Sequence, residues 1–290
     1  MRPLTRMISR DDRPKQFCRI LPEETLLETT LNRVSLKIDW ENTFYSLTAK
    51  HEFYSRPLLA KINNSNLIVQ PVNAETAPAI LYSLLRLFLI NPQAAVAFFP
   101  SDHYFLDGTA FMESVHEAFR TVEHHPENII LLGVEPEKAE TSYGWIEPAE
   151  SHLSGTPKSV SKVAFFWEKP PVDAAQAIMA RGCLWNSFVM IGKARSFLQM
   201  IEEALPELYK LFNSTTCAIG MPLEPAMIRF LYTCVDEIIF SSAVLEKSVN
   251  RLLVMKVQGV AWSDWGTRAQ IAVHYAEQSG QKVACFIRHL

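Results

Sequence analysis

Apolar stretches of strand length alternate with helix-like patterns along the first two thirds of the chain. Some stretches carry apolar residues at helical spacing, and others are apolar without interruption. We expect helices over residues 24–34, 76–90 and 110–123, and strands over residues 43–49, 66–72, 94–100 and 128–134. Strands that are apolar throughout are typical of a sheet covered by helices on both faces. The pattern therefore predicts a doubly wound α/β fold with a mostly parallel mixed sheet.

The rest of the chain continues this alternation. Further strands are expected near residues 162–168, 184–191 and 251–257, and helices near residues 172–180, 194–204 and 222–233. Residues 149–162 are rich in Ser, Gly and Pro, which favours a hairpin loop over a linker between domains. We therefore predict one domain over residues 1–290. Its core sheet and helices lie in residues 1–220, and residues 221–290 form a short C-terminal extension of helix and strand.

Composition and charge favour a protein that acts on small molecules. The 290 residues are 48% hydrophobic and carry a net charge of −3, which argues against a nucleic-acid or membrane-surface partner. The five cysteines form no C-x-x-C pair, so neither a disulfide framework nor a zinc cluster is expected. The apolar run 80–90 contains an Arg and is too short to span a bilayer. We expect a soluble, cytoplasmic protein.

Two carboxylates follow apolar strands. Asp102 comes after strand 94–100 in the segment SDH, and Asp264 follows strand 251–257 in the segment WSDWG. Ligands of open α/β sheets bind at the carboxyl ends of strands, where two carboxylates can hold a divalent cation against a phosphate. Either Asp can instead cap a helix or a turn. From these residues alone, both interpretations stay open.

Three further polar groups lie in or at the end of apolar strands. Glu168 and Lys169 end strand 162–168 before a Pro, where the acid can accept from sugar hydroxyls and the Lys can meet a phosphate. A surface ion pair is the alternative. Asn186 interrupts the apolar strand 184–191, so its amide must be hydrogen-bonded in the core or face a ligand. Near the N-terminus, Arg13 and Lys15 form either a phosphate-binding pair or a solvated basic turn.

Taken together and in order, these segments resemble the sugar-phosphate nucleotidyltransferases, and most closely the mannose-1-phosphate guanylyltransferases. The resemblance covers almost the whole chain. The matching segments are RPLTR…RPKQF (2–17), LLETTLNRV (26–34), VQPVNAETAPAI (69–80), FPSDHYF (99–105), LLGVEPEKAETSYGWIEP (131–148), EKP (168–170), LWNSF (184–188) and WSDWGT (262–267).

The resemblance implies a Rossmann-like nucleotidyltransferase fold and a role in GDP-mannose biosynthesis. The implied reaction joins GTP and mannose 1-phosphate, releases pyrophosphate and requires Mg²⁺. It implies Arg13, Lys15, Asp102, Lys169 and Asp264 as catalytic residues, with Asp102 and Asp264 as the metal ligands. It places the nucleotide near Asn73, Thr76, Ala77, Pro78 and Ser101, and the sugar phosphate near Gly144, Glu168, Lys169 and Asn186. A homodimer is compatible with the resemblance.

Two departures from the family pattern leave alternatives open. Phe188 stands where the family has Gly in WNSG, which puts the sugar specificity in question. The family's first strand and its loop of the form G-G-x-G-x-R are expected just before Pro3. Either the native protein starts upstream of Met1, or the chain is a catalytically silent homologue that binds sugar phosphates or nucleotide sugars. The strand-end groups that remain favour the first interpretation. A third alternative keeps the reaction but uses another hexose 1-phosphate with UTP or dTTP.

Overall fold

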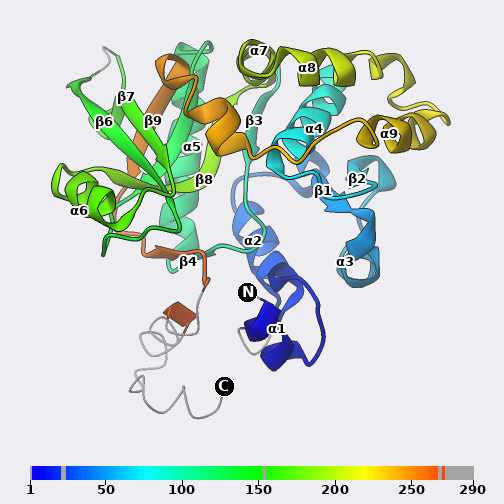
Figure 1. The fold of residues 1–290 in the computed structure, drawn as a ribbon, viewed down its shortest axis with the longest axis horizontal. Coiled ribbons are helices and arrows are strands. Elements are labelled where there is room, and N and C mark those ends of the chain that lie inside the picture. The colour runs from blue at the N-terminus through cyan, green and yellow to red at the C-terminus, as the bar shows by residue number, and fades with distance from the viewer. Residues whose placement is uncertain (1, 21–23, 153–154, 267–269, 272–290) are drawn as a thin grey trace.

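A six-stranded mixed sheet forms the centre of the computed structural model, which describes residues 2–20, 24–152, 155–266 and 270–271 (Figure 1). Its strands, in spatial order, are β3 (Ala95–Phe98), β8 (Leu184–Lys193), β5 (Ile129–Val134), β9 (Leu252–Val257), β7 (Val160–Glu168) and β6 (Gly144–His152). Two small sheets stand apart from it. One pairs β1 (Tyr45–Thr48) with β2 (Leu67–Gln70), and the other pairs β4 (Tyr104–Phe105) with β10 (Trp262–Ser263).

The directions of the strands in the central sheet differ from the prediction. The β5–β9 and β1–β2 pairs are parallel, whereas β8 runs antiparallel to β3, β5 and β6, and β7 runs antiparallel to β6 and β9. The expectation of a mostly parallel sheet is therefore wrong for the described pairings. The physical reason is that β6 and β7 form a hairpin, as the polar segment 149–162 predicted, and β8 returns beside them.

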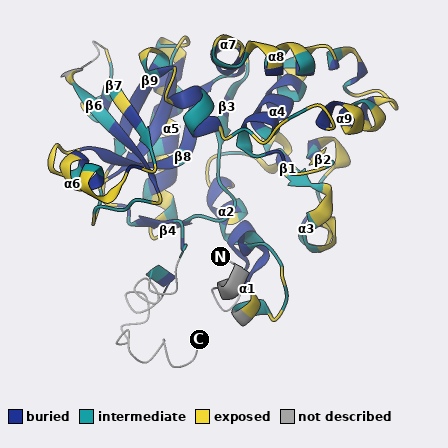
Figure 2. Cartoon of the chain, in the orientation of Figure 1, coloured by how far each residue is buried: buried dark blue, intermediate teal, exposed yellow. Residues whose placement is uncertain are grey.

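Helices cover both faces of the sheet, as the apolar strands predicted. Along β5, Ile129 and Leu131 belong to one buried cluster with α4 (Thr76–Ile90) and α7 (Ala194–Ala204), whereas Ile130 and Leu132 belong to another with α5 (Gly108–His124). Successive side chains of a strand point to opposite faces, so a strand apolar throughout serves two cores. Figure 2 shows β5, β8 and β9 mostly dark blue, as buried, and the outer side of α6 yellow, as exposed.

Further helices complete the fold, including three that the sequence pattern did not predict. The predicted ones are α2 (Leu26–Val34), α6 (Val172–Ala180) and α9 (Glu224–Tyr232), and the unpredicted ones are α1 (Arg2–Ser9), α3 (Glu52–Leu58) and α8 (Pro206–Asn213). Helix α2 begins with a reciprocal capping box between Thr25 and Glu28. No helix in the described part of the chain is long and apolar enough to span a membrane.

Strand β9 belongs to the segment 221–290 that was expected to form an extension. It lies inside the central sheet between β5 and β7, with its side chains in both buried clusters. This position brings the residues after β9 back to the carboxyl end of β5, beside the loop that follows β3. The C-terminal segment therefore helps to form the candidate site.

Gly133 on β5 offers a direct test of the packing between β8 and β9. A Cβ atom added at this position would lie 2.7 Å from Leu184 Cδ1 and 2.9 Å from Val254 Cγ2, both within the core. We expect Gly133→Ala to lower the free energy of unfolding by roughly 1–3 kcal/mol, because overpacking forces the neighbours off their rotamers. Urea unfolding followed by circular dichroism measures the change. An unchanged midpoint would contradict the packing described for β5.

Candidate active site

Lys15 joins the two strand-end carboxylate residues. Its Nζ atom lies 2.9 Å from Asp102 Oδ2 and also donates a hydrogen bond to the main-chain oxygen of Asp264. The Lys15 side chain is only 5% exposed, whereas the Asp102 carboxylate remains 34% exposed. The buried Lys15 ammonium thus contacts both the Asp102 carboxylate and the backbone of Asp264. The Asp102 carboxylate remains accessible to solvent.

The small β4–β10 sheet explains why these residues meet. Tyr104 pairs with Ser263 and Phe105 pairs with Trp262 in an antiparallel register. Asp264 directly follows β10, and His103 directly precedes β4, so the two chain segments run side by side past the ladder. Asp102 precedes His103 and is one residue farther along the chain from the β4–β10 pair. The sequence separates Asp102 from Asp264 widely, and two backbone pairings bring them to the same end of the fold.

The surroundings of Asp102 favour its ionised form. Burial opposes ionisation, but the neighbouring His103 and Lys15 outweigh it and hold the pKa of the carboxyl below its usual value. His103 Nε2 lies 3.8 Å from Asp102 Oδ1, and His103 Nδ1 lies 3.2 Å from the main-chain oxygen of Ser187. His103 therefore links the loop after β3 to the middle of β8.

Asp264 is oriented by donors on one of its oxygens. Its Oδ1 accepts a hydrogen bond of 2.6 Å from the Tyr143 hydroxyl and one of 2.9 Å from the main-chain N–H of Gly266. Gln270 Nε2 in turn donates to the Tyr143 hydroxyl at 2.8 Å. Burial and the hydrogen bond to Asp264 raise the pKa of Tyr143, so the hydroxyl stays a donor. These contacts hold the Oδ1 atom of Asp264 in place.

A second group of predicted residues converges on neighbouring strands. Gly144 on β6 pairs with Glu168 on β7, and a Cβ atom at Gly144 would lie 3.1 Å from Glu168 Oε2 and 3.4 Å from Asn186 Cβ. Asn186 on β8 is buried, and its Oδ1 accepts from the main-chain N–H of Phe188 at 3.0 Å. The glycine keeps open the space between the acid and the amide.

Lys169 completes this group at the end of β7. Its Nζ lies 3.4 Å from Glu168 Oε1, and its side chain is 55% exposed. The backbone of Lys169 is in the left-handed region, with φ +50°. The main-chain N–H of Glu168 donates to Glu246 Oε1 at 2.8 Å, a contact that sequence reasoning missed. The ion pair with Lys169 and the hydrogen bond to Glu246 thus both hold the end of β7. The Lys169 ammonium reaches solvent.

Arg13 makes its ionic contacts away from this cluster. Its guanidinium forms a two-point ion pair with Asp11, with Nη2 2.8 Å from Asp11 Oδ2, and it lies 5.6 Å above the ring of Tyr54. Hydrogen bonds to Asp11 raise the pKa of Arg13. The structure therefore brings Lys15 to Asp102 but places Arg13 with its sequence neighbour.

The five residues expected near the nucleotide divide into two sets. Asn73 and Ser101 line one cavity beside β1. Ala77 and Pro78 are buried in the first turn of α4, and Ala77 donates its main-chain N–H to the main-chain oxygen of Ile238 at 2.9 Å. Thr76 Oγ1 accepts from the main-chain N–H of Phe240 at 2.8 Å. Thr76 and Ala77 thus anchor the start of α4 to residues 238–240, which is a packing role that the motif alone did not reveal.

Three residues of the site were missed by sequence reasoning: His103, Tyr143 and Glu246. The first two lie inside segments that carried the family resemblance, FPSDHYF and ETSYGW, so position within those segments was a usable signal. Glu246 lies far from any motif quoted above. Its contact with Glu168 depends on the fold and leaves no local signal in the sequence.

The chain is similar in sequence to known proteins. The chain matches the family model described as nucleotidyl transferase over residues 1–277. It is 27% identical over 285 residues to the mannose-1-phosphate guanylyltransferase of Escherichia coli K12, covering 95% of this chain and 58% of that protein. It is 30% identical over 274 residues to mannose-1-phosphate guanylyltransferase 2 of Escherichia coli O157:H7, covering 90% and 55%. The chain therefore spans about half the length of these curated relatives.

A solved structure shares the fold. The crystal structure of mannose-1-phosphate geranyltransferase from Thermus thermophilus superposes with a TM-score of 0.80, at 24% sequence identity, covering 93% of this chain and 74% of that one. At this identity the likeness bears on architecture alone. It confirms the Rossmann-like nucleotidyltransferase fold that the sequence predicted.

Proposed function

Because this chain belongs to the nucleotidyl transferase family, we propose that it joins GTP and mannose 1-phosphate to give GDP-mannose and pyrophosphate. The observation that carries the proposal is the junction of Lys15 with Asp102 and Asp264 at one end of the fold. The substrates are proposed from the curated relatives that bear the name mannose-1-phosphate guanylyltransferase. Catalysis of this kind needs charge neutralisation and positioning more than a protein nucleophile.

We propose that the carboxylates of Asp102 and Asp264 supply oxygen ligands for a Mg²⁺ ion. Mg²⁺ prefers oxygen ligands and is commonly held by one or two carboxylates together with substrate phosphates. Asp102 is ionised by its surroundings, and Asp264 has one oxygen fixed by Tyr143 and Gly266. When bound, Mg²⁺ would neutralise charge on the phosphate oxygens of the nucleotide. Lys15 would keep the two ligand segments together.

The group on β6, β7 and β8 is the proposed sugar-phosphate site. Glu168 can accept hydrogen bonds from sugar hydroxyls, and Asn186 lies directly across the space that Gly144 keeps open. The exposed ammonium of Lys169 can meet the phosphate as a point charge. Held there, an oxygen of the sugar phosphate attacks the α-phosphorus of the triphosphate in line. The new P–O bond forms as the bond to pyrophosphate breaks.

Gly144→Ala tests the sugar site separately from the nucleotide site. The added methyl group would lie 3.1 Å from Glu168 Oε2 and 3.2 Å from Phe166 Cζ. We expect KM for the sugar phosphate to rise by about tenfold or more, since a displaced carboxylate weakens binding by ~1–3 kcal/mol. The KM for the triphosphate, measured in the same preparation, is the internal control and should change little. An equal rise in both constants would contradict the placement of Gly144.

The substrate pair is tested by competition. The protein is incubated with Mg²⁺ and an equimolar mixture of GTP, UTP, dTTP and ATP. Three hexose 1-phosphates, among them mannose 1-phosphate, are supplied in separate incubations. The products are identified by mass spectrometry. GDP-mannose should predominate. Predominance of a UDP- or dTDP-hexose would replace the proposed substrates but keep the reaction. Binding of GTP and mannose 1-phosphate without any product would favour a catalytically silent homologue.

A further inference from the structure

One short segment of the chain ties the start of α4 to the end of β7. Residues 238–246, here termed the linking segment, belong to the stretch that runs from α9 past α4 to the central sheet in Figure 1. At one end, the main-chain N–H of Ile238 donates to the oxygen of Ala74 at 3.2 Å, and the oxygen of Ile238 accepts from Ala77 at 2.9 Å. At the other end, Glu246 contacts β7. The linking segment therefore joins the regions proposed for the two substrates.

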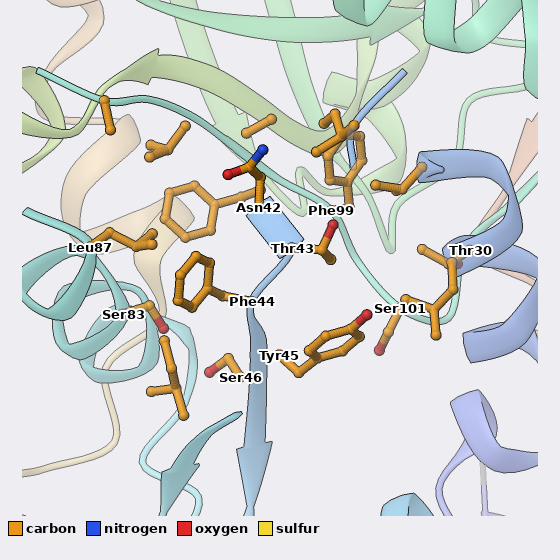
Figure 3. A pocket seen from close by; sticks show the side chains of 18 of the residues that line it. Thr30, Asn42, Thr43, Phe44, Tyr45, Ser46, Ser83, Leu87, Phe99 and Ser101 are labelled. Carbon is orange, nitrogen blue, oxygen red and sulfur yellow. The ribbon is translucent and has the colours of Figure 1, made fainter. Parts of the chain in front are cut away.

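Helix α4 borders the region proposed for the nucleotide. It forms one wall of a cavity of about 920 Å³ beside β1. In Figure 3, Ser83 and Leu87 of α4 lie across from Phe44 of β1. Asn73 and Ser101, both expected near the nucleotide, line the same cavity. The linking segment is thus bonded to the helix that borders the nucleotide region.

The backbone of Glu246 is held in place, although its side chain is exposed. Glu246 follows a π-helical turn, Ser241–Leu245, and its main-chain N–H donates to the oxygen of Ser241 at 3.0 Å. Such turns are rare and are frequent at functional sites. Val244 and Leu245 are fully buried in a cluster that they share with β7. The carboxylate of Glu246 therefore extends toward β7 from a backbone that packing fixes.

The Glu246 carboxylate takes the place of a strand neighbour at the end of β7. Within the described part of the chain, β9 pairs with β7 only at residues 160–162. Further along β7, the main-chain N–H of Glu168 donates to Glu246 Oε1 at 2.8 Å. The next N–H, that of Lys169, donates to the main-chain oxygen of Tyr143 at 3.2 Å. Lys169 has φ +50°, a conformation that persists only where the surroundings hold it. Glu246 and Tyr143 supply these two contacts.

We propose that Glu246 is a positioning residue for the sugar phosphate, an inference that rests on the sugar-phosphate site of the proposed function. Its hydrogen bond to Glu168 sets the backbone from which the Glu168 carboxylate and the Lys169 ammonium extend. The acid then faces the sugar hydroxyls and the ammonium faces the phosphate. Because the linking segment is also bonded to α4, it fixes the spacing between the two substrates, on which in-line attack depends.

Calorimetric titration of the full chain with mannose 1-phosphate, and separately with GTP and Mg²⁺, tests this role. We expect Glu246→Ala to raise the Kd of mannose 1-phosphate about tenfold, because the N–H of Glu168 loses a charged acceptor. The Kd of GTP should stay within about twofold. Glu246→Gln keeps an oxygen acceptor and should restore the Kd of mannose 1-phosphate to within about threefold of the unchanged protein. The matched control is Glu237→Ala, which removes an exposed carboxylate just before the linking segment and should change neither Kd by more than about twofold.

Hydrogen exchange of the Glu168 amide, measured by NMR, checks the contact without any ligand. The amide should exchange about tenfold faster in Glu246→Ala than in the unchanged protein, because the hydrogen bond that protects it is gone. An unchanged exchange rate would contradict the contact itself. Faster exchange with an unchanged Kd for mannose 1-phosphate would show that the contact has no part in binding, and would overturn the proposal.

Two further results would also overturn it. An equal rise in the Kd of mannose 1-phosphate and of GTP would indicate a general loosening of the fold. If the unchanged protein binds no mannose 1-phosphate, the inference fails together with the sugar-phosphate site. A selective loss of mannose 1-phosphate binding, in a protein that releases no pyrophosphate, would instead support the role of Glu246 and contradict the proposed reaction. The two proposals can therefore be told apart.

Discussion

Replacing Asp102 with Asn is expected to lower the rate of pyrophosphate release about a hundredfold to a thousandfold at ordinary Mg²⁺ concentrations. The change keeps the size of the side chain and removes the negative charge that faces solvent beside Lys15. Loss of one preorganised electrostatic contact in an active site has an effect of this order. Binding of Mn²⁺, measured by electron paramagnetic resonance as a probe of the metal site, should weaken in parallel.

An exposed aspartate provides the control for this substitution. Asp173 lies in the first turn of α6 and is solvent-exposed. Asp173→Asn makes the same chemical change and should leave both pyrophosphate release and Mn²⁺ binding within about twofold of the unchanged protein. If Asp102→Asn folds normally and retains full turnover, Asp102 does not belong to the metal site.

Lys15→Met is expected to have the largest effect on stability. The substitution removes a buried cation and leaves Asp102 beside an apolar side chain. Breaking a fully buried ion pair costs about 3–5 kcal/mol, and because the Asp102 side chain is 34% exposed we expect roughly 2–4 kcal/mol. Urea unfolding at neutral pH measures the difference. The matched control is Lys37→Met, which breaks a more exposed pair with Glu113 and should cost at most about 1 kcal/mol.

The same variant should change the dependence of stability on pH. In the unchanged protein the pKa of Asp102 is lowered, so its contribution is present above the unfolded pKa of about 3.9 and is lost as pH falls through the lower folded value. Without Lys15, burial is opposed by less positive charge and the pKa of Asp102 rises. The contribution of Asp102 should then shrink or change sign, so the variant should lose less stability than the unchanged protein as pH falls from 7 to 3. Parallel curves for the two proteins between pH 3 and pH 7 would contradict the coupling of Lys15 to Asp102.

The elements that sequence reasoning located best are those whose apolar pattern is continuous. Helix α4 has the bounds predicted for it, because its apolar run is long and ends at Asn91 before a Pro. The strands β5 and β8 were equally clear. Helix α1 was missed although Leu4, Met7 and Ile8 have helical spacing, because the stretch spans only eight residues and includes two Arg and a Pro. Helix α8 was missed although it begins with Pro206, a residue favoured at the first helical position.

The candidate site was predictable in its parts but not in its contacts. Asp102, Glu168 and Asp264 became candidates because each follows an apolar strand or stretch, although a cap or a surface ion pair was the alternative in each case. The hydrogen bond from Lys15 to the backbone of Asp264 depends on the β4–β10 pairing of two-residue strands, which no periodicity reveals. Arg13 is the opposite case, because its contact is local in the sequence. Its partner, Asp11, is two residues away, and a local ion pair competed with the expected role.

The most direct test of the proposed reaction is the stoichiometry of pyrophosphate release. The protein is mixed with GTP, mannose 1-phosphate and Mg²⁺, and pyrophosphate and nucleotide sugar are measured in the same samples over time. We predict one pyrophosphate for each GDP-mannose formed, and none when the sugar phosphate or Mg²⁺ is omitted. If no nucleoside triphosphate gives pyrophosphate with any hexose 1-phosphate, although both ligands bind, the junction of Lys15, Asp102 and Asp264 is not a nucleotidyl transfer site.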